Sequence, residues 1–235
     1  MNEESGKSPA ALNSSGDVLI RTTGTHGPDI SSQRIDELDR EALRHSLSLD
    51  ATSAPIAIDV GCGFGAQSLR FAALGVSVLM VDLVDHCATA ARINSFVGSP
   101  LCRAYHGDIR SVPEAQLPTI AHILYSQRAL HYMTFQEAGI VLARLGNRMP
   151  LGAKAFISVA SMNSELAENY HGQGVEVSKR LFPLCRSLAE KHDIFEPLCL
   201  YYQDEFASLL EASGFCVEKI TRSEFGTWKG VFQRR

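Results

Sequence analysis

Residues 57–65, which read AIDVGCGFG, decide the fold of this chain. A short apolar run leads directly into glycines at alternate positions, and an amphipathic stretch at about 65–74 follows. Glycine lets the backbone turn sharply and approach a ligand closely, and the N-terminus of a helix presents free N–H groups. The pattern predicts a strand, a tight turn and a helix that hold a nucleotide-like ligand, although a purely structural turn can also produce it.

Outward from this stretch, short apolar runs alternate with amphipathic segments, which is typical of βαβ units. Near the end of the chain, two strand-like runs have no helix-sized segment between them, which predicts an antiparallel pair. We expect a Rossmann-like α/β fold, a seven-stranded and mostly parallel sheet with helices on both faces and a C-terminal antiparallel β hairpin. The expected strands are 56–60, 77–82, 102–106, 120–125, 153–159, 215–222 and about 229–233, and the expected helices are about 65–74, 85–95, 134–147 and 204–213.

Composition divides the chain into three parts. Residues 1–17 are polar and charged, and they predict a disordered tail. Residues 18–50 predict an N-terminal helical extension, in which Ser31 or Ser32 caps a helix with apolar residues at helical spacing. Residues 51–235 predict the main domain. Within it, the helical patterns of 161–202 are broken by glycine and proline, and this segment is expected to form a helical lid over the carboxyl edge of the sheet.

The overall composition excludes several classes of protein. The 235 residues are 45% hydrophobic and have a formal net charge of −4, so they lack the general basic field of nucleic-acid-binding proteins. The six cysteines form no C-x-x-C pair and show no zinc-site spacing, so we expect no metal ion and a reduced, cytoplasmic setting. Neither a secretory signal nor an apolar run of about 18 residues is found, so no membrane partner is expected.

Acidic side chains follow two further strands of the predicted sheet. Asp82 ends the second strand, where a carboxylate can accept hydrogen bonds from both ribose hydroxyls of an adenosine. Asp108 follows the third strand, where it can accept from the exocyclic amine of adenine. Each acid taken alone can equally be a solvated turn residue or a helix cap. Together with the glycine turn, they predict a ligand site at the carboxyl edge of the sheet.

A dinucleotide site is the main alternative, because residues 61–66 also satisfy the Gly-x-Gly-x-x-Gly/Ala fingerprint. Asp59 argues against it, since a carboxylate close to a pyrophosphate is unfavourable, whereas a sulfonium or ammonium ligand attracts one. Asp108 has no evident task in a NAD site, and the C-terminal hairpin is absent from typical dinucleotide domains.

Residues 55–130 resemble motifs I to IV of the class I S-adenosylmethionine-dependent methyltransferases, and the hairpin extends the likeness to about 180 residues. The resemblance implies S-adenosyl-L-methionine as cofactor. It also implies that Asp59 supports the methionine end, that Asp82 binds the ribose and that Leu83 packs on the adenine. The residues expected to hold the cofactor are Asp59, Gly61, Cys62, Gly63, Gly65, Asp82, Leu83, Asp108, Ile109, Ser126 and Gln127.

Residues 123–132, ILYSQRALHY, occupy the position of motif IV, beside the reactive methyl group. Family members that methylate exocyclic amines of bases often carry N/D-P-P-Y here, and its absence favours a small-molecule acceptor. A tRNA or other macromolecule methyltransferase and a non-catalytic cofactor-binding subunit remain alternatives. Because the sulfonium already activates the methyl group, the protein mainly positions the acceptor. The catalytic candidates are His131, which can act as a base or simply pack, and Tyr132, which can line the acceptor pocket.

Overall fold

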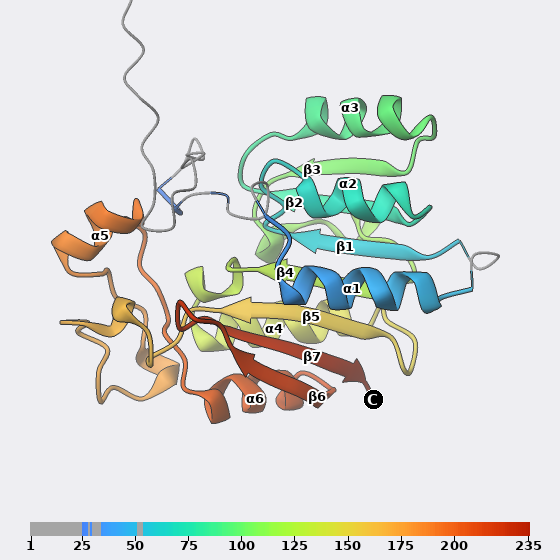
Figure 1. Ribbon diagram of the computed structural model, residues 1–235. Helices are drawn as coiled ribbons and strands as arrows, with labels where there is room; N and C mark the ends of the chain where they lie inside the picture. Colours follow the sequence, from blue (N-terminus) through green and yellow to red (C-terminus); the bar gives the residue numbers. More distant parts are fainter. Residues whose placement is uncertain (1–24, 28, 30–33, 51–53) are drawn as a thin grey trace, which may run out of the picture.

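One seven-stranded sheet organises the chain, with the strand order β3-β2-β1-β4-β5-β7-β6 (Figure 1). The computed structural model describes residues 25–27, 29, 34–50 and 54–235. Strands β1 to β5 run parallel, β7 pairs antiparallel with β5, and β6 pairs antiparallel with β7. The strands are β1 (Ile56–Val60), β2 (Ser77–Asp82), β3 (Cys102–His106), β4 (Ile123–Gln127), β5 (Lys154–Val159), β6 (Phe215–Arg222) and β7 (Trp228–Arg234).

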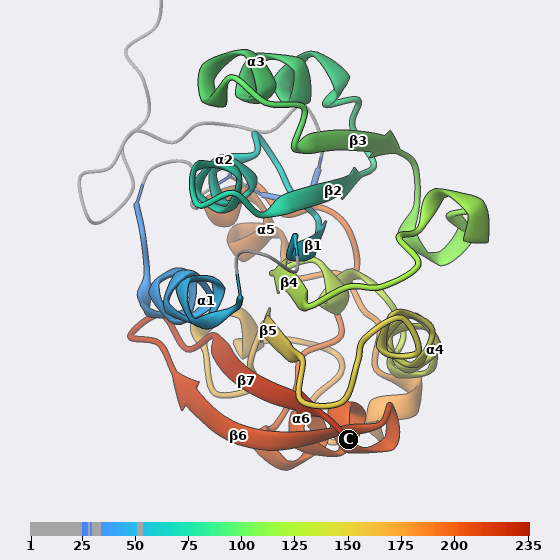
Figure 2. The ribbon, with the colours of Figure 1, turned by 90° about the vertical axis from the view of Figure 1, so that its right-hand side faces the viewer.

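Helices cover both faces of this sheet (Figure 2). On one face lie α1 (Glu37–Ser48), α2 (Ala66–Ala73) and α3 (Cys87–Val97), and on the other lie α4 (Phe135–Gly146) and α6 (Gln203–Ala212). Successive residues of a strand point to opposite faces, so Ala57 packs with the first group of helices and Ile58 with the second. Burial on both faces explains why the central strands read as continuous apolar runs.

A cover lies beyond the carboxyl ends of the parallel strands. It consists of residues 161–202 and includes α5 (Arg186–His192), which lies beyond the arrowheads of β1 and β4 in Figure 1. The cover has its own small core, formed by side chains such as Tyr170, Leu188 and Leu198. Its two ends lie side by side, because Ser161 forms a parallel β-bridge with Tyr201.

The sheet agrees with the prediction from sequence, including the C-terminal antiparallel pair. The fourth strand was predicted three residues early, at 120–125, and is observed at Ile123–Gln127. Its neighbours explain the shift: pairing with β1 begins at Ile123, and pairing with β5 continues to Gln127. Ile120 is 43% exposed and lies outside the sheet.

The predicted N-terminal helix exists, but it starts later than expected. Asp36 caps α1, and its carboxylate accepts from the backbone N–H of Asp39 while the Asp39 carboxylate accepts from the N–H of Asp36. This reciprocal capping box sets the first turn of the helix, so the predicted cap was wrong. Ser31, Ser32 and the predicted tail 1–17 lie outside the described residues. In the described part of the chain, no helix is long and apolar enough to span a membrane.

Candidate functional site

The glycine turn after β1 has the left-handed backbone that its sequence suggested. Gly61, Gly63 and Gly65 have φ angles of +71°, +52° and +78°. A side chain is excluded at the first of these positions, because a Cβ on Gly61 would lie 2.5 Å from the Cβ of Ala129. Gly65 also forms the N-cap of α2 without any side-chain hydrogen bond. The three glycines therefore bring backbone amides to the carboxyl end of the sheet.

Asp82 lies directly beside this turn. Its Oδ2 accepts a hydrogen bond of 3.0 Å from the N–H of Gly63, and its Oδ1 accepts one of 3.0 Å from the N–H of Val84. The turn is also tied to β2 by the N–H of Gly61, which donates to the carbonyl of Val81. Thus the structure brings together the glycine turn and the acid that the sequence placed at the end of the second strand.

Asp59 lies beneath the turn rather than on its surface. The side chain is 2% exposed, and Oδ2 accepts a 2.6 Å hydrogen bond from the hydroxyl of Ser68 on α2. The pKa of Asp59 is raised to about 7, mainly by burial; the hydrogen bond from Ser68 opposes this shift, and the negative charges of Asp82 and Asp29 contribute to it. The carboxyl group is therefore partly protonated near neutral pH, and a nearby cation would favour its charged form.

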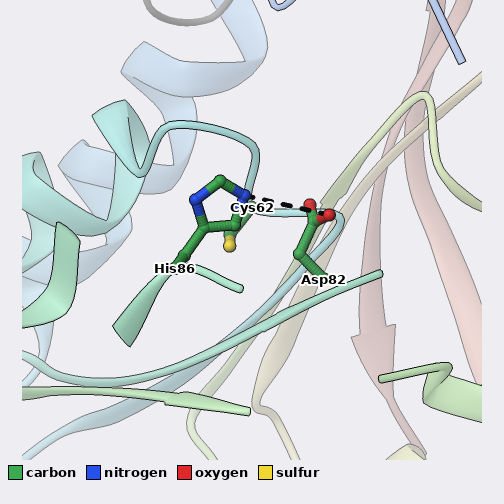
Figure 3. A group of neighbouring side chains, drawn as sticks. All are labelled: Cys62, Asp82 and His86. Atoms are coloured by element: carbon green, nitrogen blue, oxygen red, sulfur yellow. Dashed lines mark ion pairs between the residues drawn. The ribbon is translucent and has the colours of Figure 1, made fainter. Parts of the chain in front are cut away.

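Cys62, Asp82 and His86 lie close together beside the glycine turn (Figure 3). One ligand-type atom from each lies within 4.8 Å of the others, although the sequence separates them. Burial, aided by the charge of Asp59, raises the pKa of the Cys62 thiol well above its usual range, which disfavours the thiolate that a metal ion would need. Both Asp82 oxygens already accept backbone N–H groups. That no metal ion binds here stays a prediction.

The residues expected around the adenine differ in accessibility. Leu83 is 51% exposed, whereas Ile109 is 5% exposed and packs in the core. Asp108 caps the short 3₁₀ helix that follows β3, and the guanidinium of Arg110 donates to both of its oxygens. The hydrogen bond from Arg110 lowers the pKa of Asp108, so this carboxylate is charged and already paired. Adenine contacts by these three residues remain a prediction.

Ser126 and Gln127, at the end of β4, point to different surroundings. Ser126 is 1% exposed, and its hydroxyl has no hydrogen-bond partner among the described residues. The amide nitrogen of Gln127 donates to Asp36 and Asp39, both at 3.2 Å, and so helps to hold α1 against the sheet. Tyr125 also donates to Asp39. Cofactor contacts by Ser126 and Gln127 likewise remain a prediction.

His131 lies in a 3₁₀ turn after β4 and is 3% exposed. Its Nδ1 accepts a 3.1 Å hydrogen bond from the backbone N–H of Ala160. Burial, reinforced by the charge of Arg128, lowers the pKa of His131 to about 3. The ring is therefore neutral at physiological pH, with the Nδ1 lone pair engaged and the proton on Nε2. This arrangement favours the packing interpretation over a general base, since neither nitrogen has an unengaged lone pair.

Tyr132 connects the end of β4 to the N-terminal segment. Its hydroxyl donates a 2.5 Å hydrogen bond to the carbonyl of His26, and the two rings contact edge to face with centroids 4.6 Å apart. Burial raises the pKa of Tyr132, which keeps the hydroxyl protonated. Whether Tyr132 contributes to catalysis stays a prediction.

Two residues of this region were not found from the sequence. Asp29 accepts a 2.9 Å hydrogen bond from the backbone N–H of Phe64, within the glycine turn. Arg128, between the predicted cofactor and acceptor residues, has the unusual left-handed φ of +54°. The hydrogen bond between Phe64 and Asp29 joins residues 35 positions apart, so no local sequence pattern predicts it. The left-handed φ of Arg128 depends on the loop geometry after β4. Position 128 holds neither glycine nor asparagine, the residues that usually indicate this conformation.

Neither a scan of protein-family models nor a search of curated proteins finds a match to this sequence. Solved structures do resemble it. The 1,6-didemethyltoxoflavin N1-methyltransferase of Burkholderia thailandensis, solved with 1,6-didemethyltoxoflavin and S-adenosylhomocysteine bound, matches 84% of this chain and 78% of its own, with a TM-score of 0.59 and 18% identity. Mitomycin 7-O-methyltransferase matches 84% of this chain and 54% of its own, with a TM-score of 0.56 and 18% identity.

A third neighbour, an O-methyltransferase family protein from Burkholderia thailandensis, matches 84% of this chain and 56% of its own, with a TM-score of 0.55 and 15% identity. The chain therefore spans about half the length of this protein and of the mitomycin enzyme. This chain has the fold of the class I S-adenosylmethionine-dependent methyltransferases.

Proposed function

We propose that this protein is a methyltransferase that transfers a methyl group from S-adenosyl-L-methionine to a small-molecule acceptor. The observation that carries the proposal is the hydrogen bond between the N–H of Gly63 and the carboxylate of Asp82, at 3.0 Å. It joins the glycine turn to an acid on the neighbouring strand, at the edge where open α/β sheets bind ligands.

The residues present fit this cofactor better than a dinucleotide. Gly61 and Gly63 leave room at the turn for Ala129 and for the carboxylate of Asp29, which lie where a Cβ on these residues would be. Asp29, Asp59 and Asp82 make the turn acidic, and the charges of Asp82 and Asp29 contribute to the raised pKa of Asp59. An acidic turn favours a ligand with sulfonium and ammonium groups and disfavours a pyrophosphate. The exposed Leu83, next to Asp82, provides an apolar surface for a base.

The cofactor supplies an electrophilic methyl group when it is bound, so the protein mainly orients the two reactants and excludes water. In this interpretation, the cover, which consists of residues 161–202, encloses the acceptor at the carboxyl edge of the sheet. His131 and Tyr132 lie beneath the cover and help to hold it in place. The carbonyl of His131 accepts a hydrogen bond from the N–H of Cys199, and the hydroxyl of Tyr132 donates to the carbonyl of His26. Two of the structural neighbours are named for small-molecule methylation, which supports a small-molecule acceptor.

Calorimetric titration with S-adenosylhomocysteine tests cofactor binding directly. We expect saturable binding to the full chain and none of NAD. Asp82→Ala should weaken binding by about 1 to 3 kcal/mol, through the loss of charge-assisted hydrogen bonds. Asp204→Asn is a matched control, because it removes a carboxylate from an exposed position at the start of α6. Equal affinity in the Asp82 variant and the wild type would remove this site from consideration.

A screen with radiolabelled methyl groups then identifies the acceptor. Transfer from S-adenosylmethionine into a metabolite pool is the expected result. Transfer into RNA or protein instead would support a macromolecule methyltransferase. Cofactor binding without any transfer would support a non-catalytic partner subunit.

A further inference from the structure

A short N-terminal segment, which we call the strap, runs from the cover to the glycine turn. The strap consists of residues 25–27 and 29. At the cover, the carbonyl of Thr25 accepts a 2.8 Å hydrogen bond from the N–H of Phe195, and His26 forms an antiparallel bridge with Ile194. The hydroxyl of Tyr132 donates a hydrogen bond to the carbonyl of His26. These contacts fix one end of the strap against the cover.

The other end of the strap places a carboxylate at the glycine turn. Asp29 is 7% exposed, and its Oδ2 accepts a 2.9 Å hydrogen bond from the N–H of Phe64. The same oxygen lies 2.7 Å from the position that a Cβ on Gly63 would occupy. Asp29 can approach this closely because residue 63 is a glycine.

Charge at the turn indicates which group a ligand would bring there. Asp82 and Asp29 accept from the adjacent N–H groups of Gly63 and Phe64, and both raise the pKa of the buried Asp59, so three carboxylates share one small region. Such a region attracts a positive group and repels an additional anion. The N–H of Gly63 and that of Phe64 are already bound by Asp82 and Asp29, so these donors are engaged before any ligand carboxylate arrives.

We propose that Asp29 accepts a hydrogen bond from the α-ammonium group of S-adenosylmethionine, so that the strap positions the amino-acid end of the cofactor. This proposal rests on the proposed function, because it assumes that the glycine turn binds that cofactor. It adds a binding residue from outside the sheet. It also connects cofactor binding to the cover, since the strap touches both.

Two ligands that differ in the amino-acid end test the proposal. S-adenosylhomocysteine carries the α-ammonium group, whereas 5′-methylthioadenosine has the same adenosine and thioether without the amino acid. We would titrate the full chain with each by calorimetry. Asp29→Asn should weaken binding of S-adenosylhomocysteine by about tenfold to a hundredfold, as expected for one charge-assisted hydrogen bond, and leave binding of 5′-methylthioadenosine unchanged. Asp29→Glu, which keeps the charge, should recover part of the loss.

Other outcomes would overturn this proposal. Equal losses for the two ligands would mean that Asp29 only supports the turn. Tighter binding of S-adenosylhomocysteine to Asp29→Asn would mean that the carboxylate competes with the ligand's own carboxylate. Asp204→Asn again controls for the change in net charge. If neither ligand binds the wild type, the proposed function itself fails, whereas binding with parallel losses contradicts only the role of Asp29.

Discussion

The hydroxyl of Ser68 on α2 donates to the buried carboxylate of Asp59 on β1, at 2.6 Å. This hydrogen bond connects α2, the helix that follows the glycine turn, to β1, the strand that precedes the turn. A single neutral donor offsets only part of the cost of burying a carboxylate, and the pKa of Asp59 rises to about 7. The burial of Asp59, which this hydrogen bond only partly offsets, therefore makes the stability of the ligand-free protein depend on pH.

We predict that Asp59→Asn removes this dependence. An unfolded aspartate ionises near pH 3.8, whereas the buried one ionises near 7. Between these values the native state holds a proton that the unfolded state has lost, so the contribution of Asp59 to the free energy of unfolding falls as pH rises through this window. The free energy of unfolding of the variant, minus that of the wild type, should grow by roughly 2 to 4 kcal/mol from pH 4 to pH 8.

Urea unfolding at several pH values without ligand measures this difference. Asp204→Asn, at an exposed position, should follow the wild type. A difference between Asp59→Asn and wild type that stays constant over the whole range would show that Asp59 has an ordinary pKa.

For His131, we predict a role in positioning rather than in proton transfer. Its Nδ1 accepts from the N–H of Ala160, and its pKa is lowered to about 3. His131→Ala should keep the affinity for S-adenosylhomocysteine, lower kcat by less than about a hundredfold and lower stability by about 1 to 3 kcal/mol, because the N–H of Ala160 loses its acceptor. His131→Asn, which offers a carbonyl oxygen, should recover part of the stability.

The pH profile of methyl transfer decides between the two roles. A positioning role leaves the wild type without an acidic limb from His131 between pH 5 and 8. An acidic limb that disappears in His131→Ala, together with a loss in kcat of about 10² to 10⁴, would instead establish a general base.

Arg128 offers a test of strain at the site. Its φ of +54° disfavours any residue with a Cβ, and its N–H donates to both the carbonyl and the hydroxyl of Ser158 at 3.1 Å. Arg128→Gly should be more stable than Arg128→Ala by about 1 kcal/mol, because both lack the guanidinium and only glycine relieves the left-handed backbone. Thermal unfolding of the two variants gives the comparison. Equal stability would show that the strain is relaxed.

The cover should depend on one buried ion pair. Arg180 is 3% exposed, and its guanidinium contacts both carboxylate oxygens of Glu205, at 2.6 and 2.9 Å, and the carbonyls of Val175 and Leu200. Arg180→Leu leaves these groups buried without their partner, which should cost about 3 to 5 kcal/mol and increase hydrogen exchange within 161–202. Arg186→Leu is the control.

Arg186 also belongs to the cover, but its side chain is 92% exposed beside Glu190. Its loss should therefore change stability and exchange very little. If the two variants behave alike, the pair between Arg180 and Glu205 does not hold the cover in place.

The βαβ core could be predicted because its signals are local. The first three strands have the predicted bounds, since each is a short apolar run between breakers. The sequence also predicted that the glycine turn and Asp82 lie at the same edge of the sheet, because the carboxyl ends of adjacent parallel strands meet there; the hydrogen bond between Gly63 and Asp82 agrees with this placement. The fourth strand was misplaced because its limits depend on which residues of β1 and β5 face it.

The sequence by itself determined the class of fold, the glycine turn and the acid beside it, because a strand, a turn, a helix and the next strand all lie within residues 56–82 and leave few ways to fold. The tertiary structure decided how the distant segments complete the site. It brought Asp29 to Phe64 across 35 positions and the carbonyl of His26 to Tyr132 across 106. It also engaged Nδ1 of His131 with the N–H of Ala160. Such contacts depend on how loops pack over the sheet, and no periodicity or spacing in the chain encodes them locally.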